Sequence, residues 1–166
     1  MPMHGCDKCD EFVAAMRQHY AYLFDNYGFR LEHCEEGKQG EYCLVGLESA
    51  QARIKFELEQ GTPVAYLGTL ESPMQWGDEV DGVTVWYVVN ALLNFVEQKS
   101  GPPVTPKTGV YRSTDDLLAA GAARLRPRVA ELLAAFAPNR PDDWWQKFDA
   151  YQAERLRQLR QTSRPR

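Results

Sequence analysis

The spacing of the apolar residues changes at Phe29, and this change constrains the fold more than any other feature of the chain. Between residues 7 and 27, apolar side chains recur every three or four positions, which predicts an amphipathic helix that ends at Gly28. From Phe29 to about residue 70, apolar and polar residues alternate instead, which is typical of strands with one buried face. A helix followed directly by strands predicts the α+β class.

Four antiparallel strands are expected after this helix. They cover residues 29–35, 42–47, 53–59 and 64–70. The third is the clearest, because Ile54, Phe56 and Leu58 would face the core. Lys55 and the other charged residues of this strand would then face water. Short loops join antiparallel neighbours, so we predict a four-stranded meander packed on the first helix.

The rest of the chain is predicted to be helical. Residues 85 to about 100 have the spacing of a second helix, although residues 83–89 alone also fit a strand. Three prolines and two glycines make residues 101–113 a linker. Two more helices follow as an αα-hairpin, and Pro127 should kink or divide the first of them. The expected organisation is an α+β domain (1–100), the linker, and a helical hairpin with a frayed basic end (114–166).

The charge of the chain is divided between its two parts. Residues 1–100 carry 7 Lys+Arg and 16 Asp+Glu, a net charge of −9, whereas residues 101–166 carry 12 and 7, a net charge of +5. The acidic part disfavours nucleic acid, and the basic part fits a nucleic acid, an acidic partner or the acidic part itself. The sequence lacks the apolar segment of a secretion signal and any run long enough to cross a bilayer, so we expect a soluble, cytoplasmic protein.

All four cysteines lie within the first 43 residues, at Cys6, Cys9, Cys34 and Cys43. A helix of 21 residues is about 30 Å long and the strand that returns beside it covers about 23 Å, so the four should meet at one end of the domain. We expect Cys34 and Cys43 to face each other across the first hairpin. Four thiolates suit a tetrahedral structural zinc, with His4 as a substitute ligand, while unrelated thiols, disulfides or a redox role are the alternatives.

The sequence contains no phosphate-binding glycine loop, nucleophile elbow or zinc-protease helix, and no nucleophile motif accompanies His19 or His33. We therefore expect a protein without enzymatic activity. Aromatic, acidic and arginine side chains that exceed the needs of the core are candidates for contact with a protein partner. These candidates are Trp76, Asp78, Glu79 and Asp81 in the acidic loop, and Trp144, Trp145, Arg155, Arg157 and Arg160 on the last helix.

One set of spacings within residues 12–97 resembles small uncharacterised bacterial α+β proteins. The segments that carry it are Tyr27-Gly28-Phe29, Leu47-Glu48-Ser49, Arg53-Ile54-Lys55-Phe56-Glu57, Gly61 with Tyr66 and Gly68, and Trp86 to Phe95. Those proteins are similar to immunity-like or conflict-associated proteins, which are commonly encoded near a toxin or defence gene. The resemblance implies a protein that binds one protein partner. The alternatives are a zinc-stabilised structural domain, a nucleic-acid-binding module that uses the basic C-terminal helix, and an enzyme whose site is assembled from scattered residues.

Overall fold

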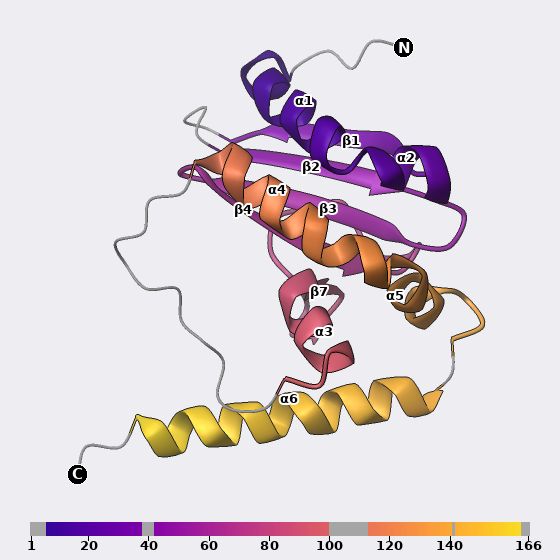
Figure 1. The fold of residues 1–166 in the computed structure, drawn as a ribbon, viewed down its shortest axis with the longest axis vertical. Coiled ribbons are helices and arrows are strands. Elements are labelled where there is room, and N and C mark those ends of the chain that lie inside the picture. Colours follow the sequence, from indigo (N-terminus) through magenta and orange to yellow (C-terminus); the bar gives the residue numbers. More distant parts are fainter. Residues whose placement is uncertain (1–5, 38–41, 100–112, 141, 164–166) are drawn as a thin grey trace.

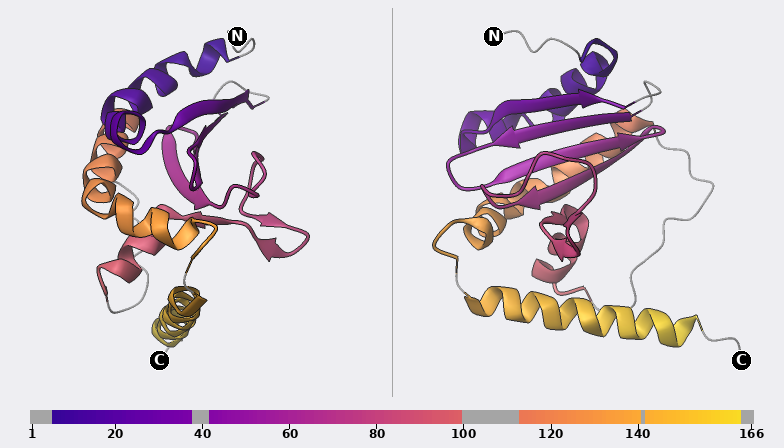
Figure 2. Two further views of the ribbon diagram at one scale, coloured as in Figure 1. Left: turned by 90° about the vertical axis from the view of Figure 1, so that its right-hand side faces the viewer. Right: turned by 180° about the vertical axis from the view of Figure 1, so that it is seen from behind.

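The computed structural model describes residues 6–37, 42–99, 113–140 and 142–163. A five-stranded antiparallel sheet separates two layers (Figures 1 and 2). Helices within residues 10–27 and 114–136 cover one face of the sheet, and the chain between residues 69 and 85 lies over the other. The predicted linker (101–113) falls outside the described residues except for its last position.

The amino-terminal helix begins and ends close to the predicted residues. A 3₁₀ turn, η1 (Asp7–Cys9), leads into α1 (Asp10–His19), and α2 (Ala21–Tyr27) continues beyond a break at Tyr20. Gly28 ends α2 with a φ of 68°, a left-handed conformation in which glycine avoids the steric penalty of a Cβ atom. The predicted end at Gly28 is therefore confirmed.

The sheet contains the predicted meander and one more strand. Its strands are β1 (Arg30–Glu36), β2 (Tyr42–Glu48), β3 (Arg53–Glu59), β4 (Thr62–Gly68) and β7 (Trp86–Val88), in the order β1-β2-β3-β4-β7. All neighbouring pairs are antiparallel. The α+β class and the four-stranded meander predicted from the sequence are confirmed.

The start of the second predicted helix is wrong. Val83–Thr84 forms β6, which pairs with β5 (Glu79–Val80), and Trp86–Val88 forms β7 at the edge of the sheet. The helix α3 covers only Val89–Val96. The apolar run fits both the helical and the strand period. Pairing with β4 makes Trp86–Val88 a strand, because it gives hydrogen-bond partners to the backbone groups at the edge of β4 and buries Trp86 to 1 % exposure beside Gly68.

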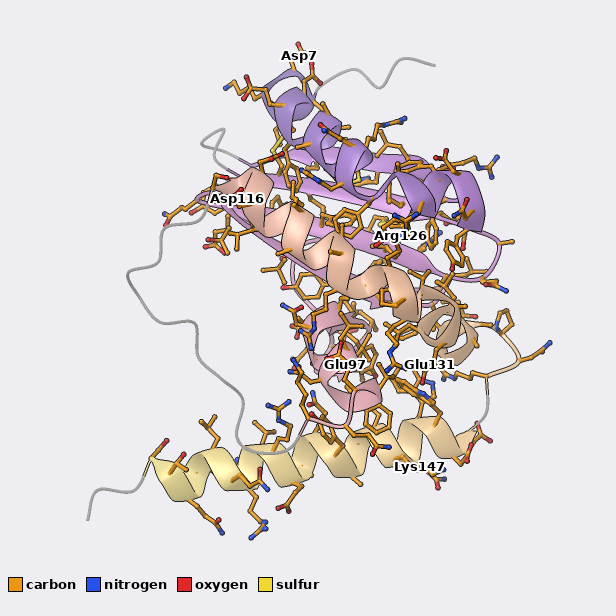
Figure 3. The ribbon with its side chains drawn as sticks, viewed as in Figure 1. Asp7, Glu97, Asp116, Arg126, Glu131 and Lys147 are labelled. Carbon is orange, nitrogen blue, oxygen red and sulfur yellow. A yellow bond between two sulfur atoms is a disulfide. The ribbon has the colours of Figure 1, made fainter. Side chains whose placement is uncertain are left out.

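The C-terminal helices follow in the predicted order. They are α4 (Thr114–Leu125), the 3₁₀ turn η2 (Arg126–Arg128), α5 (Val129–Phe136) and α6 (Asp142–Thr162). The Ser113 side chain caps α4 by accepting a hydrogen bond from the Asp116 N–H at 3.1 Å, and η2 forms at Pro127, where the division was predicted. Charged residues such as Arg126 and Glu131 lie on the outer surface of these helices (Figure 3).

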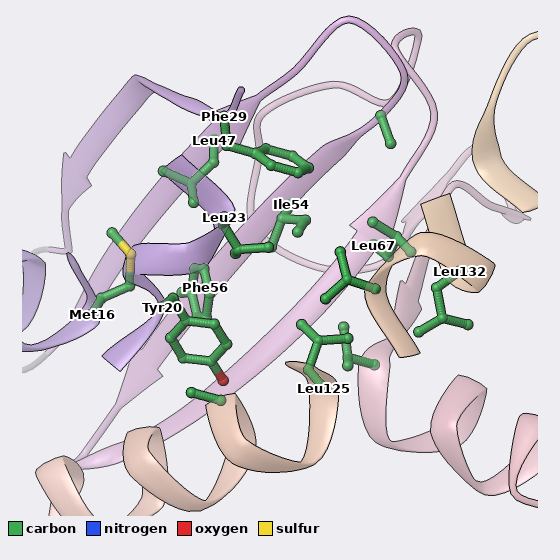
Figure 4. Packing of buried hydrophobic residues seen from close by; sticks show 14 of the residues in the cluster. Met16, Tyr20, Leu23, Phe29, Leu47, Ile54, Phe56, Leu67, Leu125 and Leu132 are labelled. Carbon is green, nitrogen blue, oxygen red and sulfur yellow. The ribbon is translucent and has the colours of Figure 1, made fainter. Parts of the chain in front are cut away.

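One apolar core joins the helices to the sheet (Figure 4). Tyr20, at the break between α1 and α2, packs edge-on against Phe56 of β3 with ring centroids 4.8 Å apart. Leu125 and Leu132, from α4 and α5, belong to the same core, so both halves of the chain contribute to it. Within the described residues, no helix has the length and apolar composition required to span a bilayer.

Candidate functional site

The four cysteines meet at one end of the domain, as the element lengths predicted. Disulfides join Cys6 to Cys34 and Cys9 to Cys43, with Cα–Cα distances of 6.1 and 6.0 Å. Cys6 and Cys9 come from η1 and the residue before it, Cys34 from β1 and Cys43 from β2. We call these four residues the cysteine corner.

The predicted pairing of Cys34 with Cys43 across the hairpin is wrong. Cys34 lies opposite Val45, and Cys43 lies opposite Glu36. From His33 to Glu36 each partner lies two residues later in the chain than the sequence suggested, and before the register shift between Leu31 and His33 the offset is one residue. A shift of two keeps each side chain on its face of the sheet, so both cysteines still reach η1.

Three residues of the cysteine corner are buried, Cys34 is half-buried, and a carboxylate lies beside them. Cys9 and Cys43 are 0 % and 1 % exposed, and Cys6 is also buried. The Sγ atoms of Cys6 and Cys9 and a carboxylate oxygen of Glu36 lie within 4.8 Å of one another. The Lys8 backbone N–H donates to Glu36 Oε1 at 2.6 Å, which fixes this carboxylate at the start of η1. His4, the predicted substitute ligand, lies outside the described residues.

A second group of predicted residues lies on a small ribbon that stands out from the sheet (Figure 2). It comprises residues 78–84, with β5 and β6 joined by Asp81 and Gly82, and we call it the acidic hairpin. Both turn residues have positive φ, 51° and 77°, as a two-residue hairpin turn requires. The side chains of Asp78, Glu79 and Asp81 are exposed, and among the described residues none of them forms an ion pair. Val83 is 64 % exposed.

Lys55 holds the segment that leads into the acidic hairpin, and the prediction that Lys55 faces water is wrong. Its side chain is 0 % exposed. The ammonium donates to Glu57 Oε1 at 2.6 Å, to the Gln75 carbonyl at 2.8 Å and to the Gly77 carbonyl. It also lies 4.7 Å from the ring centroid of Tyr66. Burial lowers the pKa of Lys55, while Glu57 opposes this change.

Trp76 is held against the sheet. Its indole Nε1–H donates to Glu35 Oε1 at 3.3 Å, and its ring meets that of Tyr42 edge-on at 6.4 Å. The ring is half-buried, so Trp76 contributes more to the position of the loop than to its exposed surface. No local signal in the sequence indicated that residues 69–85 fold back over β1 and β2.

A groove of about 810 Å³ separates the acidic hairpin from the connection between α5 and α6. Val83, Val85 and Tyr87 line one wall, and Pro138 and Arg140 are on the other. The groove therefore presents apolar side chains together with polar ones, including Arg140, beside the exposed carboxylates of the acidic hairpin. Sequence reasoning missed it, because its walls come from segments more than 50 residues apart.

The predicted partner-binding residues of α6 are used largely within the chain. Trp145 Nε1–H donates to the Ala135 carbonyl at 2.9 Å, and Trp144 stacks on Phe148 with centroids 5.6 Å apart. Both tryptophans are half-buried in an aromatic cluster that joins α6 to α3, α5 and β7. Its members are Tyr87, Phe95, Phe136, Trp144, Trp145, Phe148 and Tyr151.

The three predicted arginines of α6 differ in their surroundings. Arg155 is buried and donates to the Tyr151 hydroxyl at 2.7 Å. Arg157 pairs with Glu154 at 2.6 Å, and this contact lowers the pKa of the Glu154 carboxyl. Arg160 is exposed near the C-terminal end of α6. These side chains therefore do not form one continuous basic surface.

Each histidine that the structure describes contacts a carboxylate. His19 Nε2 lies 2.8 Å from Asp115 Oδ1, and His33 Nε2 lies 3.4 Å from Glu35 Oε2. Neither contact includes a serine or cysteine nucleophile, so these pairs lack the arrangement that nucleophilic catalysis requires.

Comparison of the chain with protein-family models, with curated proteins and with solved structures finds no match. Its function has to be inferred from the geometry of its own residues.

Proposed function

We propose that this chain is a non-enzymatic, immunity-like protein that binds one protein partner, and that the acidic hairpin is the main contact. The observation that carries the proposal is the exposure of three carboxylates and Val83 on a ribbon that projects from the sheet. The partner surface that fits it is basic, with an apolar side chain to meet Val83 and the groove behind it.

The attachment of the acidic hairpin supports this proposal. Lys55 and Trp76 fix the segment before the hairpin, and Ser72 Oγ–H donates to the Val85 carbonyl at 2.7 Å after it. A ribbon held at both ends loses little conformational entropy when a partner binds. The exposed, hydrated carboxylates of the acidic hairpin also attract a basic partner over a distance, and this electrostatic steering is strongest at low ionic strength.

The proposal is tested by neutralising the acidic hairpin and measuring capture of a partner. The test variant is Glu79→Gln with Asp81→Asn, because asparagine tolerates the positive φ of residue 81. The matched control is Glu11→Gln with Asp25→Asn, which removes the same charges from exposed positions on α1 and α2, on the other face of the sheet. Tagged forms of all three chains are incubated with a lysate of the native host, and bound proteins are quantified by mass spectrometry at two salt concentrations.

The expected result is one protein with a basic surface that the unmodified chain and the control retain and the hairpin variant loses. Its capture should weaken at the higher salt concentration. Equal capture by the hairpin variant, or no protein captured above the level of a tag-only sample, contradicts the proposal.

A cytoplasmic location is part of the same proposal, and it has a consequence for the cysteine corner. Thiols in a reducing cytosol are kept reduced, so both disulfides would be open there. A fluorescent fusion combined with cell fractionation tests the location.

A further inference from the structure

We propose that the reduced chain binds one zinc ion through Cys6, Cys9, Cys34 and Cys43, and that the zinc site and the two disulfides are alternative states of the cysteine corner. This inference goes beyond partner binding and uses none of the residues of the acidic hairpin. Zinc in such a site secures the amino-terminal helix against the first two strands, and it leaves no open position for catalysis.

The positions of the sulfur atoms carry the proposal. Cys6 Sγ and Cys9 Sγ lie within 4.8 Å of each other, and each is bonded to one of the other two sulfurs. In a tetrahedral site with Zn–S bonds of about 2.3 Å, neighbouring sulfurs are about 3.8 Å apart. The Cα atoms of Cys34 and Cys43 lie 6.1 and 6.0 Å from those of Cys6 and Cys9, so side-chain rotation after the disulfides open can bring all four sulfurs toward one ion.

The supporting elements are those of a structural zinc site. Cys6 and Cys9 are separated by two residues in a tight turn. In this turn the Cys9 N–H donates to the Cys6 carbonyl at 2.9 Å. The other two ligands come from neighbouring strands, on one face of the sheet. Burial of Cys9 and Cys43 keeps water away from the metal.

The two states differ by four electrons and one metal ion. Two dithiol reductants give four electrons and four protons to the disulfides, and each reductant becomes a disulfide. The four resulting thiols release four protons when Zn²⁺ binds, leaving a site of charge −2. In the reverse direction, two molecules of peroxide take four electrons from the thiolates and four protons from solvent, and the products are four waters, two disulfides and free Zn²⁺.

Glu36 distinguishes this assignment from a mixed ligand set. Its carboxylate lies within 4.8 Å of the Cys6 and Cys9 sulfurs, so among the residues that the structure describes it is a candidate to replace a thiolate as a zinc ligand. A Cys₄ site already carries two negative charges, so Glu36 beside it repels the thiolates and is not needed as a ligand. Its hydrogen bond from Lys8 gives it a structural role without metal.

The experiment starts from the full chain reduced with a phosphine and mixed with a small excess of ZnCl₂. Bound zinc is measured by mass spectrometry of the metal after gel filtration, and Co²⁺ substitution reports the coordination geometry through its visible spectrum. Two paired variants remove one disulfide each without leaving an unpaired thiol: Cys6→Ser with Cys34→Ser, and Cys9→Ser with Cys43→Ser. His33→Ala is the control for adventitious binding on β1.

We expect one zinc per chain in the unmodified protein, in His33→Ala and in Glu36→Gln. Each paired variant should weaken zinc binding by more than the roughly 10–100-fold that loss of an outer-shell contact causes. Addition of hydrogen peroxide to the zinc form should release the metal, as a colorimetric chelator detects. A reduced, folded chain that retains no zinc, or paired variants that retain it fully, would overturn the proposal. Loss of zinc in Glu36→Gln would overturn the four-thiolate assignment.

A measurement on the unmodified chain covers the case in which the paired variants do not fold. Zinc should slow alkylation of all four reduced cysteines by iodoacetamide, which mass spectrometry counts directly. Equal alkylation rates with and without zinc would also refute the site. A failure of this test leaves the acidic hairpin unaffected, so the two proposals are judged separately.

Discussion

Replacing Lys55 with methionine should destabilise the fold by about 3 kcal/mol. Methionine keeps a linear apolar side chain at this position and removes the ammonium, together with its contact with the Tyr66 ring. Removing one partner of a buried ion pair costs about 3–5 kcal/mol, because the other charge remains buried and unpaired. Glu57 is 14 % exposed and still accepts a hydrogen bond from the Gly77 N–H at 2.9 Å, which places the effect at the lower end of that range.

Urea denaturation followed by circular dichroism measures this effect. The midpoint should fall with the slope unchanged, and the melting temperature should drop by about 6–12 °C for a chain of this size. Lys147→Met is the matched control, because Lys147 forms an exposed pair with Asp143 at 3.3 Å (Figure 3). That substitution should change the free energy of unfolding by no more than about 0.5 kcal/mol.

The double variant Lys55→Met with Glu57→Gln separates the charge from the packing. Glutamine keeps an acceptor for the Gly77 N–H and removes the unpaired charge, so the double variant should recover part of the lost stability. If Lys55→Met costs as little as Lys147→Met, the buried ion pair contributes nothing to holding residues 69–85, and this account of the outer face is wrong.

Four further outcomes follow from the structure. Trp145→Ala should cost about 2–3 kcal/mol in urea denaturation, less than a fully buried tryptophan, and should raise hydrogen exchange throughout α6. Gly68→Ala should cost about 1–3 kcal/mol by the same measurement, because its Cβ would lie 2.8 Å from the Trp86 ring. Burial lowers the pKa of Lys55 in the folded chain, so between that lowered pKa and pH 10.5 Lys55 binds more protons in the unfolded chain than in the folded one. The unmodified chain therefore gains stability as pH rises toward 10.5, and its free energy of unfolding should exceed that of Lys55→Met by a growing amount. Burial raises the pKa of Tyr66 from 10.0 to about 12, so its contribution to stability is lost as pH rises through that interval, as urea titrations across the range will show.

The elements that the sequence predicted correctly are those whose signal is local. A change of period at Phe29, a glycine at the end of α2 and a proline between α4 and α5 each act within a few residues. The run from Val83 to Val88 fits two periods, and only its pairing with the distant strand β4 makes it a strand. Local reasoning has no access to that pairing.

In the candidate sites too, the features set by local sequence were predictable and those set by distant contacts were not. Element lengths add along the chain, so the meeting of the four cysteines could be predicted. The partner of Cys43 could not, because it depends on the register of β1 against β2, and a difference of two residues in that register changes the partner from Cys34 to Glu36. Lys55 occupies a polar position of an alternating strand, and its burial follows from a loop that no local pattern places.

The burial of Lys55 also limits how far its positive charge offsets the acidic hairpin. Glu57 supplies the counter-charge at 2.6 Å, and two backbone carbonyls satisfy the remaining donors of the ammonium. The charge of Lys55 is therefore largely satisfied within the sheet. Among the described residues, Glu79 and Asp81 form no ion pair, and Asp78 adds an exposed carboxylate that interacts electrostatically with Lys55. Under the proposed function, this acidic ribbon on a rigid base is what a basic partner would recognise.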